Sequence, residues 1–291
     1  MKTLRPHYPL AVLCRVFEVS RSGYHAFASR APSKRAQENN RLEIAIQAAH
    51  VRTRRTYGPE RLQPELQADG FKAGVGRIKR LRRKLGIRCK QVRRFKTTTD
   101  SKHDLPVAPN RLDQQFETRR PNQTWATDIT YVATGEGWLY LSGIKDLCSG
   151  EIVGYAMGHR MTTDLVGRAL LQAVSAKRPL PGLIHHSDRG SQYCSHEYQG
   201  LVKRFGMQPS MSRKGNCYDN APMESFWGTL KNELVHHRRY ATRAQAMTEI
   251  TEYIEIFYNR QRRQARLGYL SPAAFAQQFY RQQQAGGTQA D

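Results

Sequence analysis

The chain has 291 residues, and its 47 lysines and arginines outnumber its 24 aspartates and glutamates, which leaves a formal net charge of +23. A surplus of this size predicts a polyanionic partner, either nucleic acid or an anionic membrane surface. No run of apolar residues approaches the roughly 20 that a membrane-spanning helix needs. Arg15 and Glu18 interrupt the short apolar stretch near the N-terminus, which makes it a poor signal peptide. We therefore expect a cytoplasmic protein that is neither exported nor inserted into a membrane.

The five cysteines argue against two kinds of stabilising framework. Their number is odd, and no two of them have the C-x-x-C spacing of a zinc site. A disulfide framework and a structural zinc site are therefore both unsupported. Free or buried thiols in a reducing compartment are expected instead.

Charge is distributed unevenly along the chain. Residues 1–120 contain 28 basic and 10 acidic residues, whereas residues 121–291 contain 19 and 14. The basic half is the expected electrostatic footprint on nucleic acid, and the more balanced half can form a larger folded core. The expected divisions are an N-terminal helical segment, a helix-turn-helix region, a basic linker, the core and a tail, at residues 1–40, 41–95, 96–121, 122–280 and 281–291.

Three helices are predicted in the basic half. Apolar spacing predicts the first over residues 41–51 and the second from Pro59 to Asp69, before Gly70. The third covers residues 75–85, with one apolar and one basic face. Its cations are Arg77, Lys79, Arg80, Arg82, Arg83 and Lys84. A helix, a glycine-containing turn and a cation-rich helix form the helix-turn-helix arrangement, although a merely solvated basic helix gives the same pattern.

Two weaker patterns flank these helices. Residues 11–30 resemble a smaller fragment of the same kind, with Ser20 or Ser22 as the N-cap. Residues 96–121 show no sustained period and contain three prolines, which indicates a linker. Its basic side chains could follow a phosphate backbone.

The second half changes character and predicts a mixed α/β sheet. Residues rich in β-branched and aromatic side chains predict strands over 125–133, 138–147, 151–157, 182–187 and 207–210. Helices are expected from a Thr163-Asp164 cap to about residue 176, from a Ser195 cap to 205, and over 221–234 and 243–258. Three strands in a meander, followed by alternating helices and strands, indicate this α/β class.

Three carboxylates stand where metal chemistry would need them. Asp128 lies inside the first strand, where a buried charge is costly. Asp188 follows the end of an apolar strand, where open α/β sheets bind ligands. Glu224 is in the first turn of a helix, with 35 residues between it and Asp188. Such a set favours hard divalent cations, which prefer oxygen ligands, whereas Asp146 and Asp219 are expected to be structural.

The sequences around these carboxylates resemble a known family. The motifs are WATDITYV, HSDRGSQY and SRKGNCYDNAPMESFWGTLKNEL. They are similar to the catalytic motifs of DDE transposases and retroviral-type integrases, and most closely to the OrfB transposase of the IS-three family of bacterial insertion sequences. The helix-turn-helix segment and the C-terminal YNRQRRQARLGYLSPAAF also resemble that family. The resemblance covers roughly residues 10–280 and implies an RNase H-like integrase catalytic core.

The family's functional residues transfer onto matching positions of this chain. Asp128, Asp188 and Glu224 stand at the three metal-binding and catalytic carboxylates. Lys231 stands where the family has a basic residue that contacts the DNA end, seven residues or about two helical turns after the glutamate. One position departs from the family. Gln264 and Ala265 stand where members commonly have His-Ser.

The resemblance implies a reaction and a set of partners. Two Mg²⁺ ions, for which Mn²⁺ can substitute, would activate water to cleave the ends of an insertion sequence and then activate the freed 3′-OH to attack another phosphodiester. The partners would be double-stranded DNA and the upstream OrfA product, joined by frameshifting. Strand transfer joins two ends, so a homo-oligomer on DNA is expected, in a bacterial, nucleoid-associated setting.

Two other functions are compatible with parts of the sequence. A catalytically inactive DNA-binding regulator would share the basic half but not need the carboxylates. A tyrosine recombinase could use His236 and Arg239 with Tyr269 as the nucleophile. The intact carboxylate set argues against the first, and the ease of finding such a match in an Arg-rich chain argues against the second.

Overall fold

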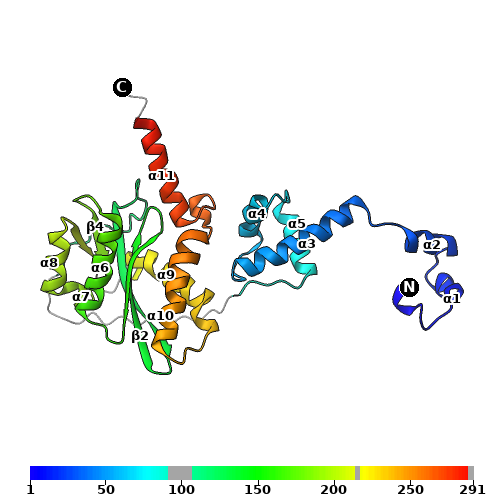
Figure 1. The fold of residues 1–291 in the computed structure, drawn as a ribbon, viewed down its shortest axis with the longest axis horizontal. Helices are drawn as coiled ribbons and strands as arrows, with labels where there is room; N and C mark the ends of the chain where they lie inside the picture. The colour runs from blue at the N-terminus through cyan, green and yellow to red at the C-terminus, as the bar shows by residue number, and fades with distance from the viewer. Residues whose placement is uncertain (91–106, 214–216, 288–291) are drawn as a thin grey trace.

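The computed structural model describes residues 1–90, 107–213 and 217–287, which form three units along a long axis (Figure 1). At one end, η1 (Lys2–Leu4), α1 (Leu10–Val16) and α2 (Arg21–Ser29) form a small unit. Ser20 caps α2, because its hydroxyl accepts the Gly23 N–H at 3.0 Å. Of the two caps that the sequence allowed, Ser20 is therefore the N-cap.

A three-helix unit follows. Its helices are α3 (Lys34–Arg52), α4 (Pro59–Ala68) and α5 (Val75–Lys84). They pack around fully buried leucines and isoleucines, namely Leu42, Ile46, Leu62, Leu66, Ile78 and Leu81. Helix α3 begins seven residues before the expected start, since the Ser33 hydroxyl caps it by accepting the Ala36 N–H. The expected boundary between residues 40 and 41 therefore falls inside a helix.

The rest of the described chain is built on one five-stranded sheet. The strands are β1 (Thr124–Thr134), β2 (Gly137–Asp146), β3 (Ile152–Gly158), β4 (Ile184–Ser187) and β5 (Gln208–Met211). Their order is β3-β2-β1-β4-β5. The first three strands are antiparallel neighbours, and β4 and β5 run parallel to β1. This mixed sheet confirms the predicted α/β class.

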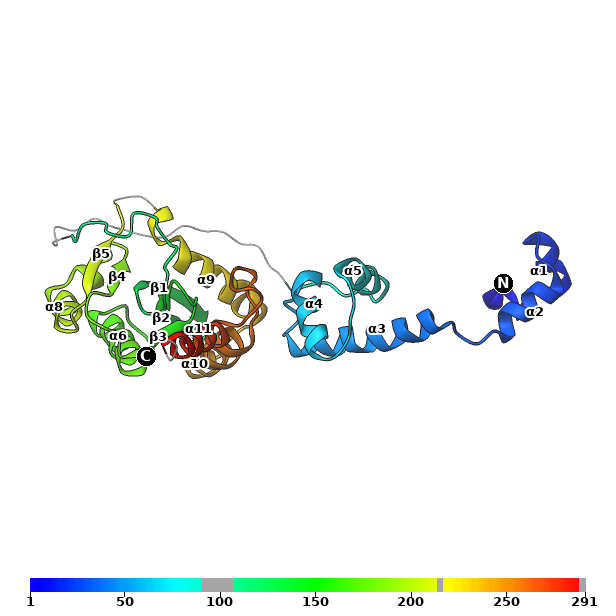
Figure 2. The same cartoon turned by 90° about the horizontal axis from the view of Figure 1, so that it is seen from above.

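Helices cover both faces of the sheet (Figure 2). On one face lie α6 (Thr163–Lys177), α7 (Ser191–Cys194) and α8 (His196–Arg204). On the other lie α9 (Ala221–Glu233), α10 (Arg243–Glu252) and the π-helix η4 (Tyr253–Gln261). The shorter pieces η2, η3 and η5 are Cys217–Asn220, Val235–His237 and Ala265–Leu267, and α11 is Pro272–Gly287.

Several element ends differ from the expectation. Thr162, not Thr163-Asp164, caps α6, and Ser195 caps α8 as predicted. The helix expected over residues 243–258 changes from α to π geometry at Tyr253. Helix α11 was not predicted, and it runs through the expected boundary at residue 280. Of the expected linker, residues 96–106 lie outside the described residues, while Leu112 packs into the core with 3% of its surface exposed.

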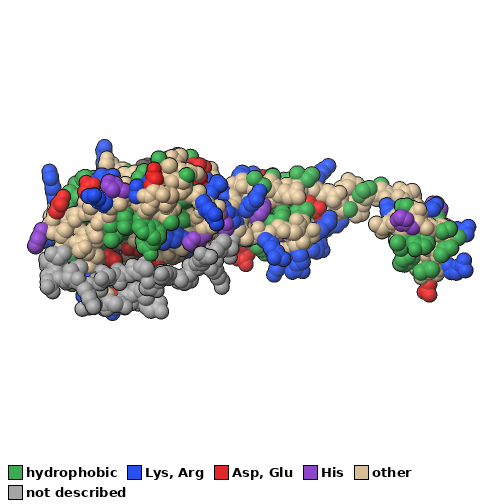
Figure 3. Space-filling view, turned by 90° about the horizontal axis from the view of Figure 1, so that it is seen from below, with side chains coloured by type: hydrophobic (Ala, Val, Ile, Leu, Met, Phe, Trp, Pro, Cys, Tyr) green, Lys and Arg blue, Asp and Glu red, His purple; other side chains and the backbone are tan. Residues whose placement is uncertain are grey.

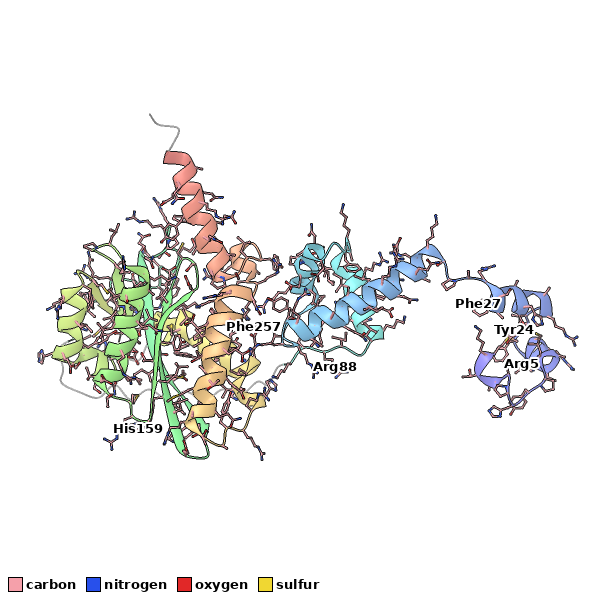
Figure 4. All side chains as sticks on the ribbon, viewed as in Figure 1. Arg5, Tyr24, Phe27, Arg88, His159 and Phe257 are labelled. Atoms are coloured by element: carbon pink, nitrogen blue, oxygen red, sulfur yellow. The ribbon has the colours of Figure 1, made fainter. Side chains whose placement is uncertain are left out.

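The three-helix unit is docked on the η4 side of the sheet domain. Phe257, labelled in Figure 4, lies on the side of the sheet domain toward the three-helix unit. The guanidinium carbon of Arg54 lies over its ring, 5.2 Å from the ring centroid. Arg263 pairs with Glu65 at 2.7 Å, and its backbone N–H donates to the Tyr57 hydroxyl at 2.6 Å. The buried apolar side chains of the two units form one continuous cluster.

Close packing of β3 on α6 makes Gly154 sensitive to substitution. A Cβ at Gly154 would lie 2.7 Å from Ala173 Cβ and closer still to the Ala169 carbonyl oxygen. We expect Gly154→Ala to destabilise the chain by about 1–3 kcal/mol, because the helix must move away from the sheet. Thermal unfolding measures the effect. Gly167→Ala, in α6 where a Cβ meets nothing closer than 4.0 Å, is the matched control and should be neutral or stabilising.

Candidate active site

Strand β1 holds Asp128 against the helix α9. Asp128 pairs with Gly143 on β2, and a Cβ at Gly143 would lie 2.7 Å from Trp227 Cη2. The glycine therefore lets the Trp227 ring lie on the sheet. From there the indole Nε1 donates to Asp128 Oδ2 at 3.0 Å. The hydrogen bond orients the carboxylate and satisfies one of its oxygens.

The parallel pairing of β1 and β4 brings Asp188 level with Asp128. His186 is the register partner of Ala126, and each aspartate follows its strand partner by two residues. Neighbouring strands lie about 4.8 Å apart, so the two carboxylates lie close together at the C-terminal end of β4. The Gly190 N–H donates to Asp188 Oδ1 at 2.9 Å and holds the turn that follows β4.

The first turn of α9 presents Glu224 near the C-terminal end of β4. Two hydrogen bonds fix the turn: Lys145 donates from β2 to the Pro222 carbonyl at 2.9 Å, and Asn220 donates to the Thr127 carbonyl at 3.1 Å. The side chain of Glu224 is exposed. Partial burial nevertheless raises the pKa of its carboxyl.

The electrostatics show that the three carboxylates act on one another. Burial raises the pKa of Asp128 to about 8, the charge of Asp188 adds to this rise, and Glu224 contributes least. Burial and the charges of Asp128 and Asp188 also raise the pKa of Tyr193. This tyrosine lies behind the site, 3.2 Å from the Thr127 hydroxyl. Ionised carboxylates this close favour a cation between them.

The donor set suits hard metal ions, although it is not closed around one. Among the described residues, no group of three or more His, Cys, Asp and Glu side chains is gathered tightly enough to hold a metal ion. Asp128 on β1 is level with Asp188, which directly follows β4, and Glu224 lies near them in the first turn of α9. Carboxylates repel one another without a cation, so a looser set is the expected arrangement. Oxygen-only donors fit Mg²⁺ or Mn²⁺.

Lys231 lies on the same side of α9 as this site. Its ammonium is 5.3 Å from the centroid of the Tyr131 ring. Burial lowers the pKa of Lys231, whereas Tyr131 and Asp128 act to raise it. The interaction with Asp128 places a positive charge beside the carboxylates, at the seven-residue spacing that the sequence indicated.

The two aspartates expected to be structural have structural contacts. Asp219 is fully buried and accepts hydrogen bonds from Arg213, Asn110 and Gln114. The hydrogen bonds from Arg213 hold the pKa of Asp219 well below its usual range. Asp146 accepts from the backbone of residue 122 and from both the N–H and the hydroxyl of residue 149.

The cations predicted on the recognition helix α5 fall into three groups. Arg77 pairs with Glu38 at 3.2 Å, and Lys84 pairs with Glu43 at 2.7 Å. Arg82 was expected on the basic face, but it is buried, with 7% exposed, since it packs inward toward Cys89. The remaining cations are exposed and form no ion pair within the described part of the chain, and they are Lys79, Arg80 and Arg83. Figure 3 shows Lys and Arg side chains gathered along one edge of the three-helix unit.

Trp227, Gly143 and Tyr193 are site residues that the sequence analysis missed. A glycine inside a strand signals a close approach by another group, so Gly143 was the detectable one. Gln264, the departure from the family pattern, is buried in a turn where its backbone N–H donates to the Leu270 carbonyl at 3.0 Å. Within the residues that the structure describes, no helix is both long and apolar enough to cross a membrane.

Comparison with known families agrees with this arrangement. Two family models, each described as an integrase core domain, match residues 118–217 and 224–280. The first match contains Asp128 and Asp188, and the second begins at Glu224. A third model, described as an HTH-like domain, matches residues 37–95. These matches confirm the expected RNase H-like core and the helix-turn-helix region.

Similar proteins extend the match to nearly the whole chain. A Shigella sonnei protein called "Insertion element IS600 uncharacterized 31 kDa protein" is 58% identical over 92% of this chain and 98% of its own length. The "Transposase InsF for insertion sequence IS3A" of Escherichia coli K12 is 40% identical over 92% of this chain and 94% of its own. The HTLV-2 integrase catalytic core domain in complex with magnesium is 18% identical, covering 54% of this chain and 97% of that one, with a TM-score of 0.42. On the strength of the two nearly full-length matches, the chain belongs to the IS3-type family of insertion-sequence transposases.

Proposed function

We propose that this chain cleaves the ends of an insertion sequence and transfers the freed 3′-OH strand to another phosphodiester. Integrases and transposases of this family are polynucleotidyl transferases in general. For this chain we propose in addition that the reaction depends on divalent metal ions and that Asp128, Asp188 and Glu224 hold them. The observation that carries it is the register of β4 on β1, since it sets Asp188 level with Asp128 opposite the helix that bears Glu224.

In this proposal, Asp128, Asp188 and Glu224 hold two Mg²⁺ or Mn²⁺ ions. The bound ions would activate the attacking oxygen and stabilise the leaving oxygen of the phosphodiester. Trp227 donates to one oxygen of Asp128 and so orients the carboxylate. Lys231 would hold the negative phosphate of the DNA end beside the carboxylates.

The test is a nicking and joining assay of the full chain on the element's own end DNA, with Mg²⁺ and with EDTA. We expect nicking and joining with Mg²⁺ and neither with EDTA. DNA binding without metal-dependent nicking would favour the inactive regulator instead. A covalent DNA–phosphotyrosine adduct at Tyr269 would favour the tyrosine recombinase.

Lys231→Ala should weaken joining more than DNA binding. The ammonium lies beside Asp128, whereas the basic helical units are expected to supply most of the affinity. We expect the joining rate to fall about tenfold and the dissociation constant to change about twofold or less. Lys231→Arg keeps the charge and should retain most of the joining rate. Equal effects on binding and joining would make Lys231 a general DNA contact.

We also propose that α5 reads DNA through Lys79, Arg80 and Arg83, supported by Arg77 and Lys84. Deleting residues 1–95 would uncover the buried face around Phe257, so a charge variant is the cleaner test. Replacing Lys79, Arg80 and Arg83 by Gln should flatten the slope of log K against log salt, by about one unit for each phosphate that the protein no longer neutralises. An unchanged slope would place the DNA footprint elsewhere.

The upstream OrfA product is the proposed partner for sequence selection. One recognition helix reads a few base pairs, and the remaining basic surface binds phosphates without regard to sequence. A fused second reading head would raise specificity through effective concentration, and pairing of two ends calls for at least two copies on DNA. The ratio of end-DNA to random-DNA affinity, for the chain alone and for the fusion, measures this. A ratio already near 10³ for the chain alone would contradict it.

A further inference from the structure

A cleft of about 420 Å³ lies between the three-helix unit and α9. Arg61 and Lys90 line it from the three-helix unit, and Arg262 lines it from the end of η4. The α9 wall includes Glu224 at one position and Thr229 one and a half turns later. The cleft is therefore continuous with the helix face that carries a proposed metal-binding residue.

The anionic group nearest Arg61 is already engaged. Glu233 accepts three hydrogen bonds from Arg262, between 2.8 and 3.1 Å, and one from the Tyr253 hydroxyl at 2.7 Å. Arg61 stands 3.9 Å from the same carboxylate, beyond hydrogen-bonding distance. Its guanidinium donors therefore remain available to the cleft that it lines, and 31% of the side chain is exposed.

Lys90 is the second cation of the cleft. Its backbone N–H donates to the Arg55 carbonyl at 2.8 Å, and its ammonium has no ion pair among the residues that the structure describes. Burial lowers the pKa of Lys90, and the nearby Arg238, Arg54 and Arg55 lower it further. Burial and Arg262 likewise lower the pKa of Arg61. Both cations would thus be stabilised by an added anion.

We propose that this cleft binds the phosphodiester backbone of the DNA strand that flanks the scissile bond, with Arg61 and Lys90 as phosphate ligands. The inference rests on the proposed function, because Glu224 is what links the cleft to the reacting phosphate. The Ser225 hydroxyl and the Asn232 amide on the α9 wall add hydrogen-bond donors suited to phosphate oxygens. The three-helix unit would then contact DNA at the active site as well as through α5.

The test compares Arg61→Gln and Lys90→Gln with Lys203→Gln, an exposed cation of α8 on the opposite face of the sheet. Binding is measured to a duplex of the element's end in EDTA, so that no cleavage occurs. We expect each cleft variant to bind about tenfold more weakly. The slope of log K against log salt should fall by about one. The Lys203 variant should bind like the wild type.

Neutral phosphates locate the contact. The same duplex is prepared with a single methylphosphonate, moved one linkage at a time past the scissile bond. When the neutral linkage is the one that the cleft contacts, the wild type should bind as weakly as the cleft variants bind the unmodified duplex. The cleft variants should bind the modified and the unmodified duplex equally well. Lys90→Gln keeps the test valid if Arg61→Gln unfolds, since Arg61 also lies near Glu233.

Two results would overturn the proposal. The first is wild-type affinity and salt dependence in both cleft variants. The second is that the cleft variants bind more weakly than the wild type at every methylphosphonate position. In that case no single linkage accounts for the difference, and the cations act on something other than a phosphodiester. Failure of the wild type to nick DNA with Mg²⁺, together with the expected binding results, would overturn the proposed function and leave the phosphate-binding cleft intact.

Discussion

Asp128→Asn, Asp188→Asn and Glu224→Gln should each abolish cleavage and joining, to below about 1% of the wild-type rate, while DNA affinity stays within about twofold. Each change removes one charged oxygen ligand but keeps the shape of the side chain, and two-metal catalysis fails without a full ligand set. We expect DNA affinity to depend mainly on the basic helical units, which these changes do not alter. The measurement is nicking and joining with Mg²⁺, beside binding in EDTA.

Asp146→Asn is the matched control, since Asp146 is a buried carboxylate held by Ser149 outside the proposed metal site. It should lower stability but leave the activity of the folded fraction unchanged. Substantial activity in any one of the three variants would mean that the residue is misassigned.

The metal-free Asp128→Asn variant should also be more stable than the wild type at about pH 8. Burial and then Asp188 raise the pKa of Asp128 to about 8, above the roughly 3.9 of an unfolded chain. The stability that depends on a protonated Asp128 is therefore complete below about pH 4 and is lost as the pH rises through 8. The difference in melting temperature between the two proteins should shrink toward acidic pH. A variant that melts lower at pH 8 would contradict this.

Glu233→Ala should destabilise the chain by about 3–5 kcal/mol. Glu233 and Arg262 form a buried ion pair, with side chains 9% and 8% exposed. Removing the carboxylate leaves the Arg262 charge and the Tyr253 hydroxyl without their acceptor, which is far costlier than breaking a surface pair. For a chain of this size we expect the melting temperature to fall by roughly 10 °C.

The control for Glu233 is an exposed pair. Arg168 and Asp164 lie one helical turn apart in α6, with side chains 51% and 72% exposed. Arg168→Ala should cost about 0.5 kcal/mol or less. Replacing Glu233 and Arg262 together by leucine and methionine should recover much of the stability, since two apolar side chains leave no buried charge. Similar melting temperatures for Glu233→Ala and Arg168→Ala would show that the buried pair is unimportant.

Much of the fold and of the candidate site follows from local sequence patterns. The five predicted strands are all present, because β-branched and apolar runs are visible in short windows. The proximity of Asp128 and Asp188 also follows, once both are placed on strands of one sheet. Element ends were less accurate where a single cap decides them, as Ser33 does for α3 and Thr162 does for α6.

What could not be predicted depends on contacts between distant parts of the chain. Trp227 reaches Asp128 across 99 positions, and Arg54 reaches Phe257 across an even longer separation. No periodicity encodes such pairs, because they form only when separate elements pack together. The burial of Arg82 is a different case, because its hydrogen-bond partner Cys89 lies only seven positions away, just beyond the end of α5.

The carboxylate of Glu233, which lies beside two arginines, limits which segments can be exchanged between related transposases. Glu233 of α9 lies beside both Arg61 of α4 and Arg262, so neither the three-helix unit nor α9 has a complete surface by itself. Chimeras that exchange only the first 95 residues between related transposases would bring mismatched partners to this point and should express poorly. Chimeras that exchange the three-helix unit together with the segment from α9 through Arg262 keep the contact whole. The unit that can be exchanged intact therefore consists of two segments that are separate in the sequence. We expect residues at this contact in the two segments to vary together among relatives.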